Sequence, residues 1–249
     1  RFTVGVFKKA AGRKLTSLEA HDVMCAVAAA VVVGGVRRSA MISLSDLADD
    51  RMRHCKSGNW WDENVNRSYA NNSVAYTRKP DMGAFLREWT SLYESKSGER
   101  GIFNREAAKS QAIKYGRRNP DHDFGTNPCG EILLRSMQCC NLSEIIIRPD
   151  DAIEQLKEKA RIASLLGTLQ SALTDIRYLR PAWKKNMEEE RLLGVSFTGI
   201  LDNDLMNHRN DYLQETLEDL REIVVETNKK WADKLGIQQS TATTCVKPS

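Results

Sequence analysis

The stretch Asn141-Leu142-Ser143-Glu144-Ile145-Ile146-Ile147 decides the fold class. It is predicted to form a strand, and its apolar run is typical of a strand that is buried on both faces. A long helical pattern over residues 151–179 follows it, and a strand-like apolar run over residues 194–200 comes next after a charged helix. Short strands that alternate with long helices predict an α/β fold.

The same alternation extends in both directions from this stretch. Thr16-Ser17-Leu18-Glu19 has the spacing of a capping box, and it predicts a helix from Ser17 to Val33 that ends at two glycines. Residues 57–72 and 116–127 are polar and without period, so we expect loops there. The other expected helices cover residues 46–56, 82–94, 105–115 and 211–235, and the other expected strands cover residues 2–7, 40–44, 101–103, 131–134 and 241–246.

Length and composition exclude several classes of protein. The 249 residues are 41% hydrophobic and 28% charged, which fits a globular domain or part of one and excludes collagen-like, coiled-coil and disordered chains. The longest apolar run, Ala26–Val33, is far shorter than the roughly 18 residues that a membrane span needs, and no signal peptide is visible. The chain opens at Arg1 and stops at Ser249 without a closing element, so we expect an internal fragment of a longer protein.

The charges and cysteines indicate a compartment and exclude some partners. Lys and Arg number 37 and Asp and Glu 33, a net charge of +4, and their mixing along the chain does not favour a nucleic-acid-binding protein. The six cysteines form no Cys-x-x-Cys pair and the four histidines have no metal-binding spacing, so we expect no metal ligated by the protein. This cysteine content fits a reducing, cytoplasmic compartment, where clustered cysteines such as Cys129, Cys139 and Cys140 are buried or redox-active.

A second stretch, Phe124-Gly125-Thr126-Asn127-Pro128-Cys129-Gly130-Glu131, carries the candidate chemistry. In an extended backbone, Asn127, Cys129 and Glu131 would face the same way, so an amide, a thiol and a carboxylate would line one wall. Because Pro128 cannot pair inside a central strand, we expect a loop tip or a strand start here. A thiol between an amide and a potential base suits chemistry on a polar substrate. From spacing alone, a turn with a buried structural cysteine is an equal alternative.

Another motif, Cys140-Asn141-Leu142-Ser143-Glu144, begins eleven residues after Cys129. Together with Asn127-Pro128-Cys129-Gly130-Glu131 it resembles the large catalytic chain of ribonucleotide reductase, and most of all the adenosylcobalamin-dependent class II. Four more segments that are familiar from this family cover nearly the whole chain in order: residues 34–40, 70–73, 97–101 and 244–249. The resemblance implies that residues 1–249 are the central part of a ten-stranded α/β barrel, incomplete at both ends.

The resemblance also implies a reaction, the reduction of ribonucleoside di- or triphosphates to 2′-deoxyribonucleotides, with triphosphates favoured. Adenosylcobalamin would be the source of a thiyl radical on Cys129, which takes the 3′-hydrogen of the substrate. Glu131 would accept the 3′-hydroxyl proton, and Asn127 would hold a ribose hydroxyl. Cys140 would be one member of the cysteine pair that becomes a disulfide during turnover. The other member would lie upstream of this chain.

Further binding residues follow from the same resemblance. The expected partners are a ribonucleotide substrate, a deoxynucleotide or ATP effector and a thioredoxin-like reductant, with no nucleic acid and no membrane. Cys25 and Cys139 are expected to serve in packing. The expected substrate-binding residues are Thr126, Pro128, Gly130, Pro248 and Ser249, and the expected allosteric loop contains Gly34, Gly35, Arg37, Arg38 and Ser39.

Two alternatives stay open. The di-iron class I large subunit shares the Asn-x-Cys-x-Glu pattern, although its second redox cysteine lies farther downstream than Cys140 does here. The chain could otherwise be a split, non-catalytic piece that needs the missing parts of the protein.

Overall fold

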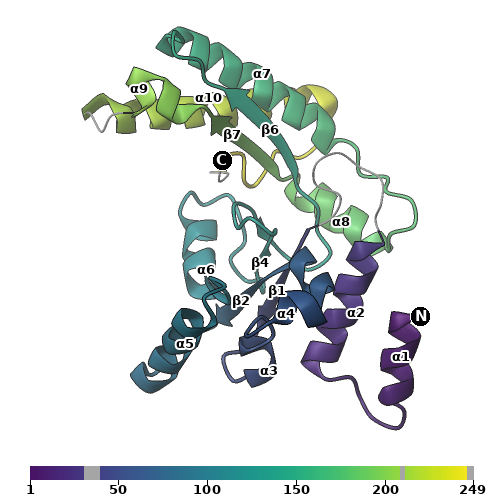
Figure 1. The fold of residues 1–249 in the computed structure, drawn as a ribbon. Helices are drawn as coiled ribbons and strands as arrows, with labels where there is room; N and C mark the ends of the chain where they lie inside the picture. The colour runs from purple at the N-terminus through teal and green to yellow at the C-terminus, as the bar shows by residue number, and fades with distance from the viewer. Residues whose placement is uncertain (31–39, 208–210, 246–249) are drawn as a thin grey trace. The chain divides into compact units, whose positions relative to one another are not determined.

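Short strands and longer helices alternate throughout the structure, which is a computed structural model that describes residues 1–30, 40–207 and 211–245 (Figure 1). The residues fall into two units, Arg1–Lys109 and Ser110–Ser249. Each unit contains strands that pair in parallel, which confirms the α/β class expected from the sequence.

The first unit is built around a three-stranded parallel sheet. The strand β1 (Met41–Ser45) pairs with β2 (Ala70–Tyr76), and β2 also pairs with β3 (Gly101–Asn104). The helical elements that accompany these strands are α1 (Phe2–Lys9), α2 (Ser17–Ala29), α3 (Asp50–Arg53), α4 (Trp60–Glu63), the 3-10 helix η1 (Val65–Tyr69), α5 (Met82–Ser95) and α6 (Arg105–Ile113).

The capping box begins α2 where the sequence predicts it. The Thr16 side chain accepts a hydrogen bond from Glu19 N at 3.2 Å, and the Glu19 carboxylate accepts one from Thr16 N at 2.9 Å. Cys25 on this helix is fully buried, which confirms its expected packing role. Residues 31–33, the expected end of the helix, lie outside the described residues.

The strand expected over residues 2–7 is wrong, because these residues form α1. A strand needs a neighbour for its backbone groups, whereas this segment satisfies them locally. Gly5 N donates to Arg1 O and Ala10 N donates to Val6 O, both at 3.0 Å. The helix therefore forms although none of its side chains is buried.

The loop expected over residues 57–72 is also wrong, since it contains α4, η1 and the beginning of β2. Contacts with residues that are distant in sequence hold this polar segment in the sheet. Asn72 is 2% exposed, its Nδ2 lies 3.0 Å from Cys55 Sγ, and its Oδ1 lies 3.1 Å from His21 Nε2. The helix expected over residues 46–56 shrinks to the four residues of α3.

The second unit has a β–α–β core. The strands β6 (Asn141–Ile146) and β7 (Leu193–Thr198) pair in parallel, and α7 (Ile153–Ser171) lies against both of them (Figure 1). Buried residues from these strands, α7 and α10 share one hydrophobic cluster, which includes Ile145, Leu156, Val195 and Leu220. The other elements of the unit are β4 (Gly125–Thr126), β5 (Leu133–Leu134), α8 (Pro181–Glu190), the 3-10 helix η2 (Ile200–Asp202), α9 (Asp204–Asn207) and α10 (Asp211–Leu235).

Three expectations for this unit need correction. The strand β6 is not buried on both faces, because Leu142 and Ile146 are 36% and 50% exposed and only the face that carries Ile145 joins the cluster. The helix α7 ends at Ser171, well before residue 179. Of the strand expected over residues 241–246, the described residues 241–245 form a parallel bridge between Val195 and Thr244, and residue 246 lies outside the described residues.

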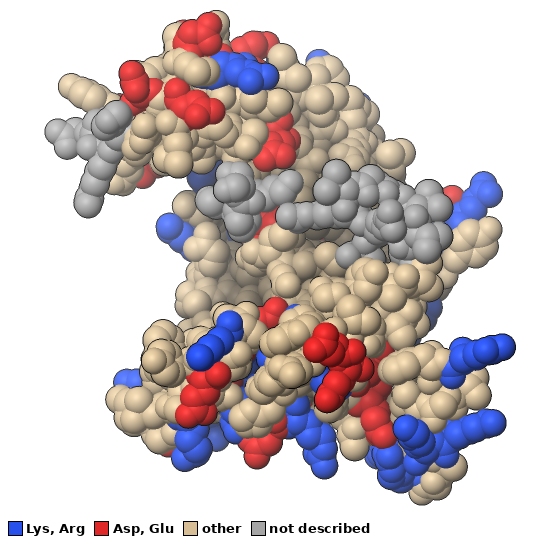
Figure 2. Space-filling view, viewed as in Figure 1, with Lys and Arg blue, Asp and Glu red and all other residues tan. Residues whose placement is uncertain are grey.

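Basic and acidic side chains lie among each other over much of the face shown in Figure 2, as their mixing along the chain leads us to expect. Within the described ranges, no helix is both long and apolar enough to cross a lipid bilayer.

Candidate functional site

The residues Asn127 to Glu131 form the tip of a hairpin between β4 and β5, which pair antiparallel. This confirms the loop tip expected at Pro128. The backbone turns here, because Gly130 N donates to Asn127 O at 3.0 Å and Gly130 has a φ of 85°. The backbone is therefore not extended through this motif, and the expectation that Asn127, Cys129 and Glu131 line one wall stays a prediction.

The Asn127 amide organises this hairpin. Its Oδ1 accepts hydrogen bonds from Ile132 N at 3.0 Å and from the Thr126 hydroxyl at 3.3 Å, and Asn127 N donates to Ile132 O at 3.4 Å. The amide oxygen thus closes the loop, and the NH₂ end of the amide is the part that remains to meet a ligand.

Glu131 is half-buried, and its atom Oε2 is buried without a hydrogen-bond partner in the described part of the chain. A buried carboxylate oxygen with no partner is costly for stability, and such groups are concentrated at functional sites. Glu131 is therefore a candidate for contact with a ligand.

The charge of Glu131 acts on the Cys140 thiol. Burial raises the pKa of the Cys140 thiol to about 11, and the negative charges of Glu131 and Cys139 add to this effect. Burial also raises the pKa of Cys139. Both cysteines are half-buried, and the raised pKa makes Cys140 a neutral thiol at neutral pH.

A buried ion pair anchors the hairpin. The Arg118 guanidinium donates to both carboxylate oxygens of Glu190, at 3.0 and 2.8 Å, and to Leu133 O at 2.9 Å. Burial alone would raise the pKa of Glu190, but Arg118 and the Gln138 amide hold it below its ordinary value. The returning strand of the hairpin is therefore tied to the residue that ends α8.

Three segments converge on Gly194 in β7. A methyl group on Gly194 would lie 2.3 Å from Leu142 Cδ2, 2.9 Å from Ile132 Cδ1 and 3.0 Å from Cys245 Sγ. The side chains of Ile132, Leu142 and Cys245 thus occupy the space beside Gly194. Ile132 follows Glu131, and Leu142 comes two residues after Cys140.

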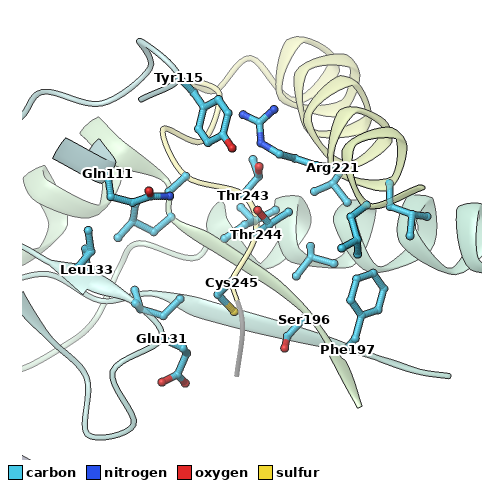
Figure 3. A pocket seen from close by; sticks show the side chains of 18 of the residues that line it. Gln111, Tyr115, Glu131, Leu133, Ser196, Phe197, Arg221, Thr243, Thr244 and Cys245 are labelled. Atoms are coloured by element: carbon cyan, nitrogen blue, oxygen red, sulfur yellow. The ribbon is translucent and has the colours of Figure 1, made fainter. Parts of the chain in front are cut away.

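The second unit contains a cavity of about 600 Å³. Glu131 lies at one end of it, Tyr115 and Arg221 lie at the other, and Thr243, Thr244 and Cys245 run between them (Figure 3). Of the described residues, Asn127, Cys129 and Cys140 do not line it. The apolar lining includes Leu133, Leu193, Val195, Phe197, Met206 and Leu217.

The structure places the remaining expected residues as follows. Thr126, Pro128 and Cys129 are half-buried in the hairpin, and Gly130 is exposed at its turn. The expected allosteric residues Gly34, Gly35, Arg37, Arg38 and Ser39, and the expected phosphate-loop residues Pro248 and Ser249, lie outside the described residues. Among the described residues, no cluster of His, Cys, Asp and Glu could hold a metal ion.

Sequence reasoning missed the cationic end of the cavity. Arg117 lies in a segment expected to be a polar loop, and Arg221 lies on the charged face of a long helix. Only the fold brings these residues and Tyr115 to one cavity, and no local pattern marks them.

Comparison with known proteins gives a consistent result. The chain is 30% identical over 268 residues to the adenosylcobalamin-dependent ribonucleoside-triphosphate reductase of Lacticaseibacillus paracasei, which covers 96% of this chain and 34% of that protein. It is 29% identical to the enzyme of the same name from Lactobacillus delbrueckii subsp. bulgaricus, over 98% of this chain and 36% of the relative. No protein-family model matches the chain.

A solved structure agrees with these relatives. The crystal structure of a B12-dependent class II ribonucleotide reductase matches 99% of this chain and 36% of its own chain, with a TM-score of 0.75 and 25% identity. The chain is thus a homologue of the ribonucleotide reductases in both sequence and fold. In particular, it corresponds to a segment of about one third of the adenosylcobalamin-dependent, class II enzymes.

Proposed function

We propose that this chain supplies the thiyl-radical centre of an adenosylcobalamin-dependent ribonucleotide reductase. The observation that carries the proposal is the buried Glu131 oxygen without a partner among the described residues, on the same hairpin as Cys129, with a charge that acts on the Cys140 thiol. The relatives carry this activity in their names and give no support to the di-iron alternative. Their names also favour triphosphates as the substrates.

The cofactor fits the site in one respect, because Cys129, a thiol that one-electron chemistry can oxidise, is half-buried at a hairpin tip. When bound, adenosylcobalamin supplies one-electron chemistry that can turn a thiol into a thiyl radical. A Cys129 thiyl radical would take the 3′-hydrogen of the ribose. Glu131 Oε2 would take the 3′-hydroxyl proton, and the Asn127 NH₂ group would donate to a ribose hydroxyl.

Cys140 would serve as a reductant in this scheme. The 2′-hydroxyl leaves as water, and two thiols supply two electrons and two protons as they form a disulfide. The raised pKa of Cys140 keeps its proton in place until this step. Cys139 would be a packing neighbour, and the second thiol would belong to the part of the protein that corresponds to the rest of the relatives.

The chain spans about a third of the curated relatives it matches. We therefore propose that residues 1–249 are the central part of the ten-stranded barrel, and that they need the remaining parts for turnover. The other proposed partners are a deoxynucleotide or ATP effector and a thioredoxin-like reductant in the cytoplasm, where the cysteines stay reduced.

The test is a reduction assay of the complete protein that contains this chain, with a ribonucleoside triphosphate, a dithiol and adenosylcobalamin. Cys129→Ser should abolish deoxynucleotide formation while substrate binding persists, and the matched variant Cys139→Ser should keep most of the activity. Product formation by Cys129→Ser would refute the thiyl assignment. Full activity without the cobalamin would favour the di-iron alternative.

A further inference from the structure

Two arginines that line the cavity, Arg117 and Arg221, have no acidic partner among the described residues. The Arg117 guanidinium donates to the uncharged acceptors Ser240 O at 3.2 Å and Thr243 Oγ1 at 3.3 Å, and its Nε is buried without a partner in the described chain. The Arg221 guanidinium lies 3.5 Å from the centre of the Tyr115 ring. None of the ion pairs among the described residues of this unit involves either arginine.

The two cations act on each other. Burial lowers the pKa of Arg117, and the positive charge of Arg221 lowers it further. Uncharged acceptors relieve this repulsion only in part, whereas an anion between the guanidinium groups would relieve it directly. By contrast, the neighbouring Arg118 is fully paired with Glu190. The two half-buried arginines therefore have positive charge that no carboxylate among the described residues of this unit neutralises.

We propose that Arg117 and Arg221 form a binding site for the phosphate group of a small molecule whose apolar part occupies the cavity. Guanidinium groups bind phosphate through paired hydrogen bonds, and a phosphate offers more charge and more oxygens than a carboxylate. The cavity has the size of a typical small-molecule site, and its lining beyond the arginines is mostly apolar.

The proposed ligand shares the cavity with Glu131 but not with Cys129 or Cys140, which do not line it. Tyr115 and Arg221 lie at the end of the cavity away from Glu131, as Figure 3 shows. The proposal therefore does not depend on the proposed function, and it adds a ligand that the reduction chemistry does not use.

The probes are phenyl phosphate, inorganic phosphate and benzoate, titrated into the 249-residue chain by calorimetry at low salt, where charge interactions are least screened. We expect phenyl phosphate to bind more tightly than the other two. Arg221→Gln should weaken its binding about tenfold or more, because charge-assisted hydrogen bonds are lost. The matched control Arg161→Gln, on the exposed face of α7, should leave the affinity unchanged.

A second measurement guards against an effect on folding. Phenyl phosphate should raise the thermal unfolding midpoint of the wild-type chain and of Arg161→Gln, and it should not raise that of Arg221→Gln. Cys129→Ser should bind phenyl phosphate like the wild type, so the two proposals can fail separately. Equal affinity of Arg221→Gln and wild type, no binding of phenyl phosphate, or tighter binding of benzoate would each overturn the proposal.

Discussion

Replacing Glu131 by Gln removes a negative charge that acts on the Cys140 thiol. That charge and burial together raise the pKa of Cys140 from 9.0 to about 11, and burial is the larger cause. The substitution keeps the size of the side chain and leaves burial in place. The pKa of Cys140 should therefore fall and yet stay above its ordinary value.

The size of the effect follows from the thiolate fraction, because only the thiolate reacts with an alkylating agent. At pH 8, a thiol with a pKa of about 11 is roughly one part in a thousand thiolate, against roughly one part in ten for a pKa of 9. The alkylation rate of Cys140 at pH 8 should therefore rise several-fold in Glu131→Gln, and by less than about 100-fold.

The assay is alkylation by iodoacetamide from pH 7 to pH 11, with the modified cysteine identified by mass spectrometry of its peptide. Glu144→Gln is the matched control, since it removes one exposed carboxylate from β6 and should leave the profile of Cys140 in place. The reasoning is refuted if Glu131→Gln leaves the pH profile of Cys140 unchanged. It is also refuted if Glu144→Gln shifts that profile equally.

Two further predictions concern stability and are measured by urea unfolding. Gly199→Ala should destabilise the chain by about 2–5 kcal/mol, because Gly199 has a φ of 78° and a methyl group there would lie 2.5 Å from Ile147 O. Gly236→Ala, also at positive φ but in open space, should cost only about 1–2 kcal/mol, and equal losses in the two variants would contradict the predicted clash. Arg118→Met leaves the Glu190 carboxylate buried without its cation and should cost about 3–5 kcal/mol, so a loss below about 1 kcal/mol would show that Glu190 finds another partner.

Local signals predicted much of the fold. The capping box at Thr16 gave the beginning of α2, because capping depends on neighbours within a few residues, and the expected helix over residues 211–235 matches α10. The α/β class followed from the strand–helix–strand order, which the structure has in β6, α7 and β7. The strand β2 was missed because Asn72 is held by His21 and Cys55, which are distant in sequence.

The candidate site could be predicted only in part. The motif around Cys129 predicted a loop tip, and the structure has one. The extended backbone assumed for this motif was wrong, because Gly130 N donates to Asn127 O and Ile132 N donates to the Asn127 amide oxygen, and spacing does not encode these bonds. The pairing of Arg117 with Arg221 joins residues about a hundred positions apart, and it required the fold.

Gly194 gives β7 a role beyond that of a paired strand. The space left by its missing side chain admits Ile132, Leu142 and Cys245, so one hydrogen atom sets how closely three separate chain segments approach. These three segments lead to the proposed base Glu131, the proposed reductant Cys140 and the proposed substrate loop. A larger side chain at position 194 would therefore displace all three segments, although Gly194 itself has no proposed chemical role.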